Sequence, residues 1–243
     1  MATVFATPAD MWQLATPPDS LFQDQSLAPG TWSTILRIGS GTGTMTLLKE
    51  SSPLFEFSVM VKCVVAGELI VYGVVNPGVV PQFVISLDGG TTYSPPYLPN
   101  DNGTIKFIRG GFTLQFLNNT APSFLVGDMF AFTTTASPDV VRFLSAASAQ
   151  VESVIRNTYQ PPYVSWGDDV RLRVCELARW YLLKKRGIDK DQDFEVYKPT
   201  EALKWLDDVG KGYIQPSIVE VNREKLYPEI MVVRRPFRTS WIY

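Results

Sequence analysis

The chain has 243 residues, of which 45% are hydrophobic and 19% are charged, and its formal net charge is −2. This composition predicts a folded globular protein and excludes intrinsic disorder, while the balanced charge argues against a surface built to hold nucleic acid. Because the chain contains no histidine, catalytic triads and metal sites that depend on histidine are excluded.

The two cysteines, Cys63 and Cys175, lie far apart in the sequence, so we expect both to be buried small side chains rather than zinc ligands. The first ten residues lack the basic and apolar regions of a secretion signal. No apolar stretch approaches the ~20 residues of a membrane span. We therefore expect a protein made in the cytoplasm with no membrane partner, no metal and no cofactor.

The first predicted element is a short helix that begins at Thr7, with Pro8 at its first position and Asp10 in its first turn. Met11 and Trp12 give it an apolar surface, and a pair of prolines at 17–18 ends it. A helix this short needs other elements to pack against.

A charge-poor block follows, with only five basic and six acidic residues among the 107 residues from 31 to 137. Runs rich in Val, Ile, Phe and Thr, separated by turns rich in Gly, Asn and Asp, predict several short strands. This pattern is typical of an antiparallel β-sandwich. The predicted strands are 44–48, 55–65, 79–87, 104–108, 113–117 and 129–135.

Three helices are predicted after this block. The first begins at Ser137 and has apolar residues on one face as far as 155, and the second covers about 168–186. The third covers about 194–209, with Pro199 marking a kink or its true start. The fold class is therefore α+β, with more than one domain.

Helical periodicity disappears after Pro216, and 230–233 is a candidate short strand. The last ten residues contain three arginines and no acid, followed by an aromatic end. We interpret residues 216–243 as an extended docking arm. The residues predicted to bind a partner are Ile230, Met231, Val232, Val233, Arg234, Arg235, Phe237, Arg238, Trp241 and Tyr243.

No motif predicts catalysis. The acidic run 189–193 lacks the glycine and glutamate of an EF-hand, and the glycine-rich run 39–43 precedes a strand rather than a helix, unlike a P-loop. The adjacent carboxylates 168–169 and 207–208 are expected to serve as helix caps and surface charges. Five aromatic residues of the β block are candidates for a sugar-binding face, although sandwich cores also use aromatics: Trp32, Tyr93, Tyr97, Phe107 and Phe112.

Four helical segments resemble, in sequence and in order, the small head–tail adaptor proteins of Mu-like phages and siphophages. These segments are 6–11, 148–159, 170–183 and 202–212. In that family the first two helices are joined directly, whereas here the β block lies between them. The β block resembles a β-sandwich module found in phage virion proteins. The residues that carry this resemblance are 41–44 and 86–94. The resemblance implies a discontinuous helical adaptor domain (1–28 and 138–215), an inserted β-sandwich (29–137) and the docking arm (216–243).

The resemblance also implies a structural virion protein without enzymatic activity. The family forms rings, commonly dodecameric, that lie beneath the portal, complete the head and receive the tail. The expected partners are the portal protein, neighbouring copies, a tail-side neck or terminator protein and packaged DNA in the channel. The arm is expected to dock on the portal or a neighbouring subunit, with 230–233 adding a strand to an exposed sheet edge. The alternative is a carbohydrate-binding decoration or host-recognition protein led by the β-sandwich.

Overall fold

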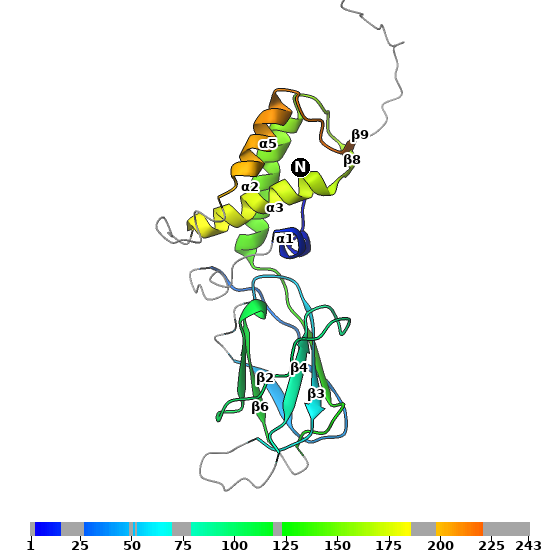
Figure 1. Cartoon of the computed structure of the whole chain (residues 1–243), viewed down its shortest axis with the longest axis vertical. Helices are drawn as coiled ribbons and strands as arrows, with labels where there is room; N and C mark the ends of the chain where they lie inside the picture. The colour runs from blue at the N-terminus through cyan, green and yellow to red at the C-terminus, as the bar shows by residue number, and fades with distance from the viewer. Residues whose placement is uncertain are drawn as a thin grey trace, which may run out of the picture.

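The computed structural model describes residues 3–15, 27–48, 51, 53–69, 79–118, 123–185 and 198–220. The molecule is elongated, with helices at one end and a β-sandwich at the other (Figure 1). The helices come from both sides of the β block in the sequence, because, among the residues described, one helix precedes the strands of the sandwich and three follow them. The α+β class and the antiparallel sheets predicted from the sequence are thus confirmed.

Two antiparallel sheets make up the sandwich. One has the strand order β1-β7-β3-β4 and the other the order β2-β6-β5. All six predicted strands are present, five of them with shorter bounds and β6 one residue longer, and β1 is an addition. Its three residues are all exposed, so it lacks the alternation that reveals a strand in sequence. The strands are β1 (Leu36–Ile38), β2 (Thr44–Leu47), β3 (Ser58–Val65), β4 (Gln82–Ser86), β5 (Thr104–Phe107), β6 (Phe112–Leu117) and β7 (Met129–Thr133).

Phenylalanine rings fill the space between the two sheets. Phe83 of β4 stacks on Phe116 of β6 with ring centroids 4.0 Å apart. Phe124 meets the ring of Phe83 edge-on at 5.4 Å, and Phe130 of β7 meets Phe116 in the same way at 6.2 Å. Each of these rings is at most 1% exposed, so the rings form the dry core that joins the sheets.

The glycine-rich run 39–41 is a turn between the sheets, as predicted. The Asp128 carboxylate accepts hydrogen bonds from the backbone N–H groups of Ser40 (3.0 Å), Gly41 (3.2 Å) and Leu125 (2.9 Å). Gly39 has a φ of +141°, and a Cβ there would lie 2.0 Å from an Asp128 oxygen. The glycine is therefore required by the close approach of the buried carboxylate.

The helical part contains α1 (Pro8–Leu14), α2 (Pro138–Ile155), α3 (Asp168–Lys185) and α5 (Thr200–Gly210). Thr7 and Asp10 form a capping box at the start of α1, and Ser137 caps α2. Pro199 is the N-cap of α5, so it marks a true start; residues 186–197, including the acidic run 189–193, lie outside the described residues. Helix α1 contacts α2 and α3, and α2, α3 and α5 contact one another.

Polar contacts tie the two ends of the β block to the helices. The Ser137 hydroxyl donates to the carbonyl of Ala28 (2.5 Å), and the Ser137 N–H donates to the carbonyl of Leu54 (3.0 Å). The Asp139 carboxylate accepts from the Ala28 N–H (2.8 Å) and pairs with Lys185 (2.6 Å). These contacts lower the pKa of Asp139, first through Lys185 and then through Ala28.

Aromatic contacts join the same two parts. Trp12 of α1 lies edge-on to Phe57, with ring centroids 5.0 Å apart, and 5.8 Å from the ring of Phe55. The first helix therefore rests against the sandwich as well as against α2 and α3.

Replacement of Phe116 should test the core. Phe116→Ala removes a ring that stacks between the sheets and leaves a cavity, so we expect the free energy of unfolding to fall by about 3–5 kcal/mol in guanidinium titrations. The matched control is Leu117→Ala, because the adjacent Leu117 is 47% exposed; its expected change is within about 0.5 kcal/mol. Equal effects of the two variants would contradict this description of the core.

Asp139→Asn should test the junction. Loss of the charged contacts is expected to lower the free energy of unfolding by about 2 kcal/mol at pH 7. Because the folded state lowers the pKa of Asp139, its stabilisation is complete above the unfolded pKa of about 4 and disappears as the pH falls through the folded value. Denaturant titrations at several pH values should therefore show the gap between wild type and variant closing in acid.

The control is Asp101→Asn, which changes an exposed carboxylate in a turn of the sandwich. It should show no such gap at pH 7. A gap for Asp139→Asn that is constant down to pH 2 would contradict the proposed role of the charge.

Candidate functional site

The described part of the chain ends in a small two-stranded sheet on the helical part. It pairs β8 (Tyr163–Trp166) with β9 (Ile218–Glu220) in antiparallel register. Neither strand was predicted, although both carry β-branched or aromatic residues and Pro161-Pro162 directly precedes β8. The segment predicted as an extended arm from residue 216 thus begins as a paired strand, and its remaining residues follow Glu220.

The N-terminal segment holds this sheet against the bundle. The ring of Phe5, which is buried, lies 5.1 Å from Trp166 in an edge-on contact and 5.7 Å from Tyr163. The indole N–H of Trp166 donates to the Phe5 carbonyl at 2.5 Å. Directly after Trp166, the Gly167 N–H donates to the carbonyl of Ser217 at 2.7 Å. Both strands are therefore fixed to the bundle, and only the part of the arm after Glu220 lies beyond them.

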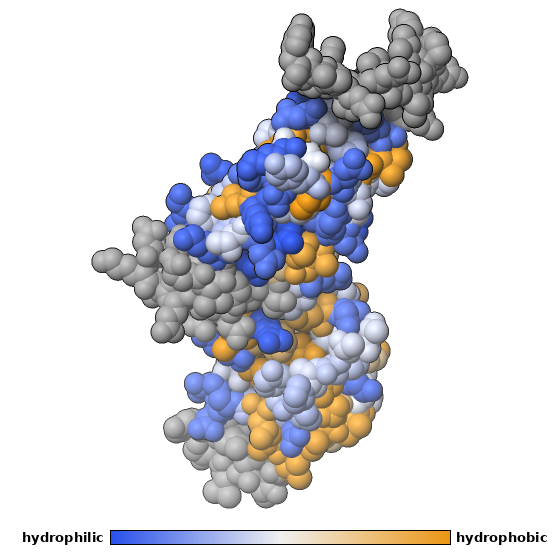
Figure 2. Space-filling view, turned by 45° about the horizontal axis from the view of Figure 1, so that its top comes forward, coloured by the Kyte–Doolittle hydropathy of each residue, from blue (hydrophilic) through white to orange (hydrophobic). Residues whose placement is uncertain are grey.

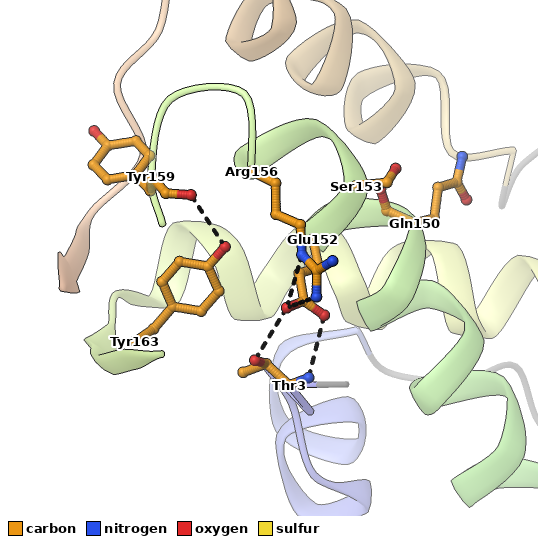
Figure 3. Close-up of polar contacts among 7 residues, drawn as sticks. All are labelled: Thr3, Gln150, Glu152, Ser153, Arg156, Tyr159 and Tyr163. Atoms are coloured by element: carbon orange, nitrogen blue, oxygen red, sulfur yellow. Dashed lines mark hydrogen bonds and ion pairs between the residues drawn. The ribbon is translucent and has the colours of Figure 1, made fainter. Parts of the chain in front are cut away.

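A polar cluster beneath the sheet fastens the same N-terminal segment to α2 (Figure 3). Glu152 of α2 is 3% exposed and accepts hydrogen bonds from the backbone N–H (3.2 Å) and hydroxyl (3.3 Å) of Thr3. Arg156, one turn later, pairs with the same carboxylate at 3.0 Å. This arrangement satisfies a buried charge and holds Thr3, the first residue that the structure describes, against α2.

Tyr163 links this cluster to β8. Its hydroxyl donates to the backbone carbonyl of Tyr159 at 3.4 Å, across the turn that follows α2 (Figure 3). Burial, followed by the nearby Glu152 carboxylate, raises the pKa of Tyr163. The hydroxyl therefore stays protonated at neutral pH and remains a hydrogen-bond donor.

The outer side of the sheet and the loop before it present apolar side chains to solvent. Val164 of β8 is 61% exposed and Val219 of β9 is 54% exposed, while Tyr213 and Ile214 are exposed in the loop after α5. Surface of this kind next to the start of the arm is suited to contact with another protein. The ten predicted partner-binding residues, from Ile230 to Tyr243, lie outside the described residues, and their role stays a prediction.

A second candidate site is a cleft of about 990 Å³ between α1 and the end of the sandwich. Tyr93, Tyr97 and Phe107, three of the five aromatic residues proposed for sugar binding, line it. Phe112 instead lies in the core at 2% exposure, and Trp32 is exposed but does not line the cleft. The sequence did not reveal that Trp12 of α1 joins the lining, because only the tertiary structure brings α1 to the sandwich.

The adjacent carboxylates make structural contacts. Asp169 accepts from the N–H of Ser217 at 3.1 Å, and Asp168 pairs with Arg171 at 3.3 Å. Asp207 pairs with Lys211 one turn later, at 2.5 Å. Among the residues that the structure describes, no group of three or more potential metal ligands comes together, and no helix is long and apolar enough to cross a membrane.

Comparison with known families identifies the origin of the chain. Residues 114–233 match the family described as Bacteriophage Mu, Gp36. The chain is a phage protein. The match begins within β6, includes α2, α3, α5 and both strands of the small sheet, and extends into the arm as far as residue 233. No curated protein and no solved structure matches the chain.

The matched segment of this phage protein leaves out α1 and most of the sandwich. The resemblance of residues 6–11 to the start of an adaptor protein therefore rests on sequence pattern and on the packing of α1 against α2 and α3.

Alkylation should test the burial of the cysteines in this phage protein. Burial, followed by the Asp128 charge, raises the pKa of Cys63 to about 11, and burial, followed by the charges of Asp10 and Glu176, raises the pKa of Cys175 to about 12. Iodoacetamide at pH 8 should therefore leave both thiols of the native protein unmodified, because thiolate reacts and thiol does not. Mass spectrometry after unfolding should show both modified.

Thr34→Cys provides the control, since Thr34 is exposed on the sandwich. That variant should gain one modification in its native state. Rapid modification of Cys63 or Cys175 in the native wild type would show that the burial described is wrong.

Proposed function

We propose that this phage protein is a structural virion protein, a head–tail connector that forms a ring beneath the portal, completes the DNA-filled head and receives the tail. The observation that carries the proposal is the match of residues 114–233 to the family of Bacteriophage Mu, Gp36, which includes the helices after the sandwich. The packing of the adaptor-like segments supports the same proposal. The helices that contain these segments pack together in one bundle, and the segments are 6–11, 148–159, 170–183 and 202–212.

The packing of α1 supports a discontinuous adaptor domain. It contacts α2 and α3, although the whole sandwich separates it from them in sequence. Met11 of α1 and Val174 of α3 are both fully buried. We propose that 1–28 and 138–215 form the adaptor domain and that 29–137 is an insertion carried on it.

The β8–β9 sheet supports a docking role for the arm. Because β9 is bonded to β8, and β8 is held by Phe5 and the Trp166 contact, a partner bound to residues 221–243 would be attached to the core of the bundle. The proposed partners are the portal protein, neighbouring copies of the chain in a ring and a tail-side protein. Arg234, Arg235 and Arg238 would meet acidic groups or carbonyls, and Trp241 would be the apolar anchor.

This function requires binding surfaces rather than catalysis. A phage structural protein acts by assembly, and the polar clusters around Glu152 and Asp139 join segments of the chain to one another. We therefore propose that the protein is not an enzyme.

Truncation after Glu220 should test the docking arm. It leaves β9 and its anchor residues in place, whereas removal of all residues from 217 would also destroy the β8–β9 sheet. We expect the truncated protein to keep its unfolding temperature but to lose binding to portal rings of its own phage. Light scattering and electron microscopy of mixtures with portal provide the measurement.

The double variant Arg234→Ala with Arg235→Ala should weaken the same binding by about tenfold or more, and Lys204→Ala, an exposed change on α5, is the control. Normal portal binding by the truncated protein would refute the role of the arm. A full-length chain that stays monomeric and ignores portal would refute the connector itself.

A further inference from the structure

We propose that the cleft between α1 and the sandwich is a binding site for a neutral oligosaccharide. The cleft has a volume of about 990 Å³ and lies where the helical and β parts meet. Figure 2 shows that the molecule narrows there and that apolar side chains lie at the surface around this waist. A cleft of this size between two parts of a protein is a common setting for ligand binding.

The lining presents aromatic surface in fixed positions. Tyr93 is 39% exposed, and its hydroxyl donates to the sulfur of Met60 at 3.1 Å, so the ring is held while part of it faces solvent. Tyr97 lies edge-on to Phe107 at 5.8 Å, and Trp12 is supported by Phe57. Sugar rings have apolar C–H faces that pack on aromatic rings, so such a lining suits a saccharide.

The charges of the lining balance. Glu56 and Asp88 contribute two carboxylates, and Lys106 and Arg109 contribute two cations. An anionic or cationic ligand would meet a like charge as well as an opposite one, whereas the hydroxyl groups of a neutral sugar both donate to carboxylates and accept from cations. The balance therefore favours a neutral, polyhydroxylated ligand.

One wall of the cleft is a rigid turn. The Asp88 carboxylate accepts from the N–H groups of Thr91 and Thr92, each at 2.9 Å, and from the hydroxyl groups of Ser86 and Thr92, each at 2.6 Å. These bonds hold the pKa of Asp88 well below its usual range. The turn that carries Tyr93 is thus formed before any ligand binds, which lowers the entropic cost of binding.

The sheet edge beside the cleft favours a sugar over a peptide. A peptide commonly binds by adding a strand to a free edge. The edge of β4 that faces the cleft is occupied, because Phe83 and Tyr97 exchange two backbone hydrogen bonds (3.0 and 2.7 Å) and Ser94 donates to the carbonyl of Ile85 (2.8 Å). A ligand therefore meets side chains along this wall, as saccharides do in their binding sites.

The test is an array of neutral and acidic oligosaccharides probed with the full-length chain, followed by calorimetric titration of the neutral glycan with the highest signal. Tyr93→Ala should weaken binding about tenfold or more, and Lys106→Ala should weaken it severalfold. Tyr93→Phe should bind like wild type, because the hydroxyl contacts Met60 rather than the ligand. Trp32→Ala is the matched control, since Trp32 is 38% exposed but lies outside the cleft.

Thermal unfolding of each variant shows whether it is folded, and Lys106→Ala, an exposed change, keeps the test valid if Tyr93→Ala unfolds. The proposal is overturned if no glycan binds, if only acidic glycans bind, if binding survives both Tyr93→Ala and Lys106→Ala, or if Trp32→Ala removes it. Binding of a peptide of residues 230–243 to the cleft in place of sugar would also overturn it. Portal binding is a separate measurement, so this site and the connector role can fail independently.

Discussion

The ends of the β block are held together by a few partly buried hydrogen bonds, and the arrangement of the rest of the molecule depends on them. Ala28 before the block and Ser137 after it are bonded to each other, and Asp139 binds both Ala28 and Lys185 of α3. The chain leaves the helical part after α1 and returns to it at α2. The two segments that connect the helices with the sandwich therefore have to lie side by side. A sandwich satisfies this requirement because its first and last strands, β1 and β7, are neighbours in one sheet.

The same constraint accounts for the cleft at the junction. Because these two connecting segments fix the sandwich at one end of the bundle, α1 lies over the end of the β block, where Trp12 contacts Phe57. The remaining space beside this contact is lined by the Asp88 turn and by the segment from Lys106 to Arg109. A surface that belongs to neither part alone thus arises from the way the sandwich is attached to the helices. The sugar-binding role proposed for this surface is separate from the proposed role of the protein in the neck.

The opposite end of the bundle is organised around the N-terminal segment. Phe5 is packed between α2 and β8, with its N–H bonded to Ser148 at 3.2 Å and its carbonyl bonded to Trp166. Residues from the start, middle and end of the described chain are therefore held in one structure. This fastening makes β9 a fixed base for residues 221–243, to which the proposed partners would bind.

The amino-acid sequence alone predicts the fold class, the six main strands, the helix starts at Thr7 and Ser137 and the turn at 39–41, because these features depend on local periodicity and backbone preference. Folding of the whole chain is needed to produce the β8–β9 pairing, the Glu152 contact with Thr3 and the cleft. β1 and β9 are three residues long and do not alternate, so pairing with a distant strand is what makes them strands. Thr3 and Glu152 are 149 residues apart, and no local pattern joins residues at that separation. Contacts of this kind arise because helical segments from both sides of the sandwich pack together, which is a property of the whole chain.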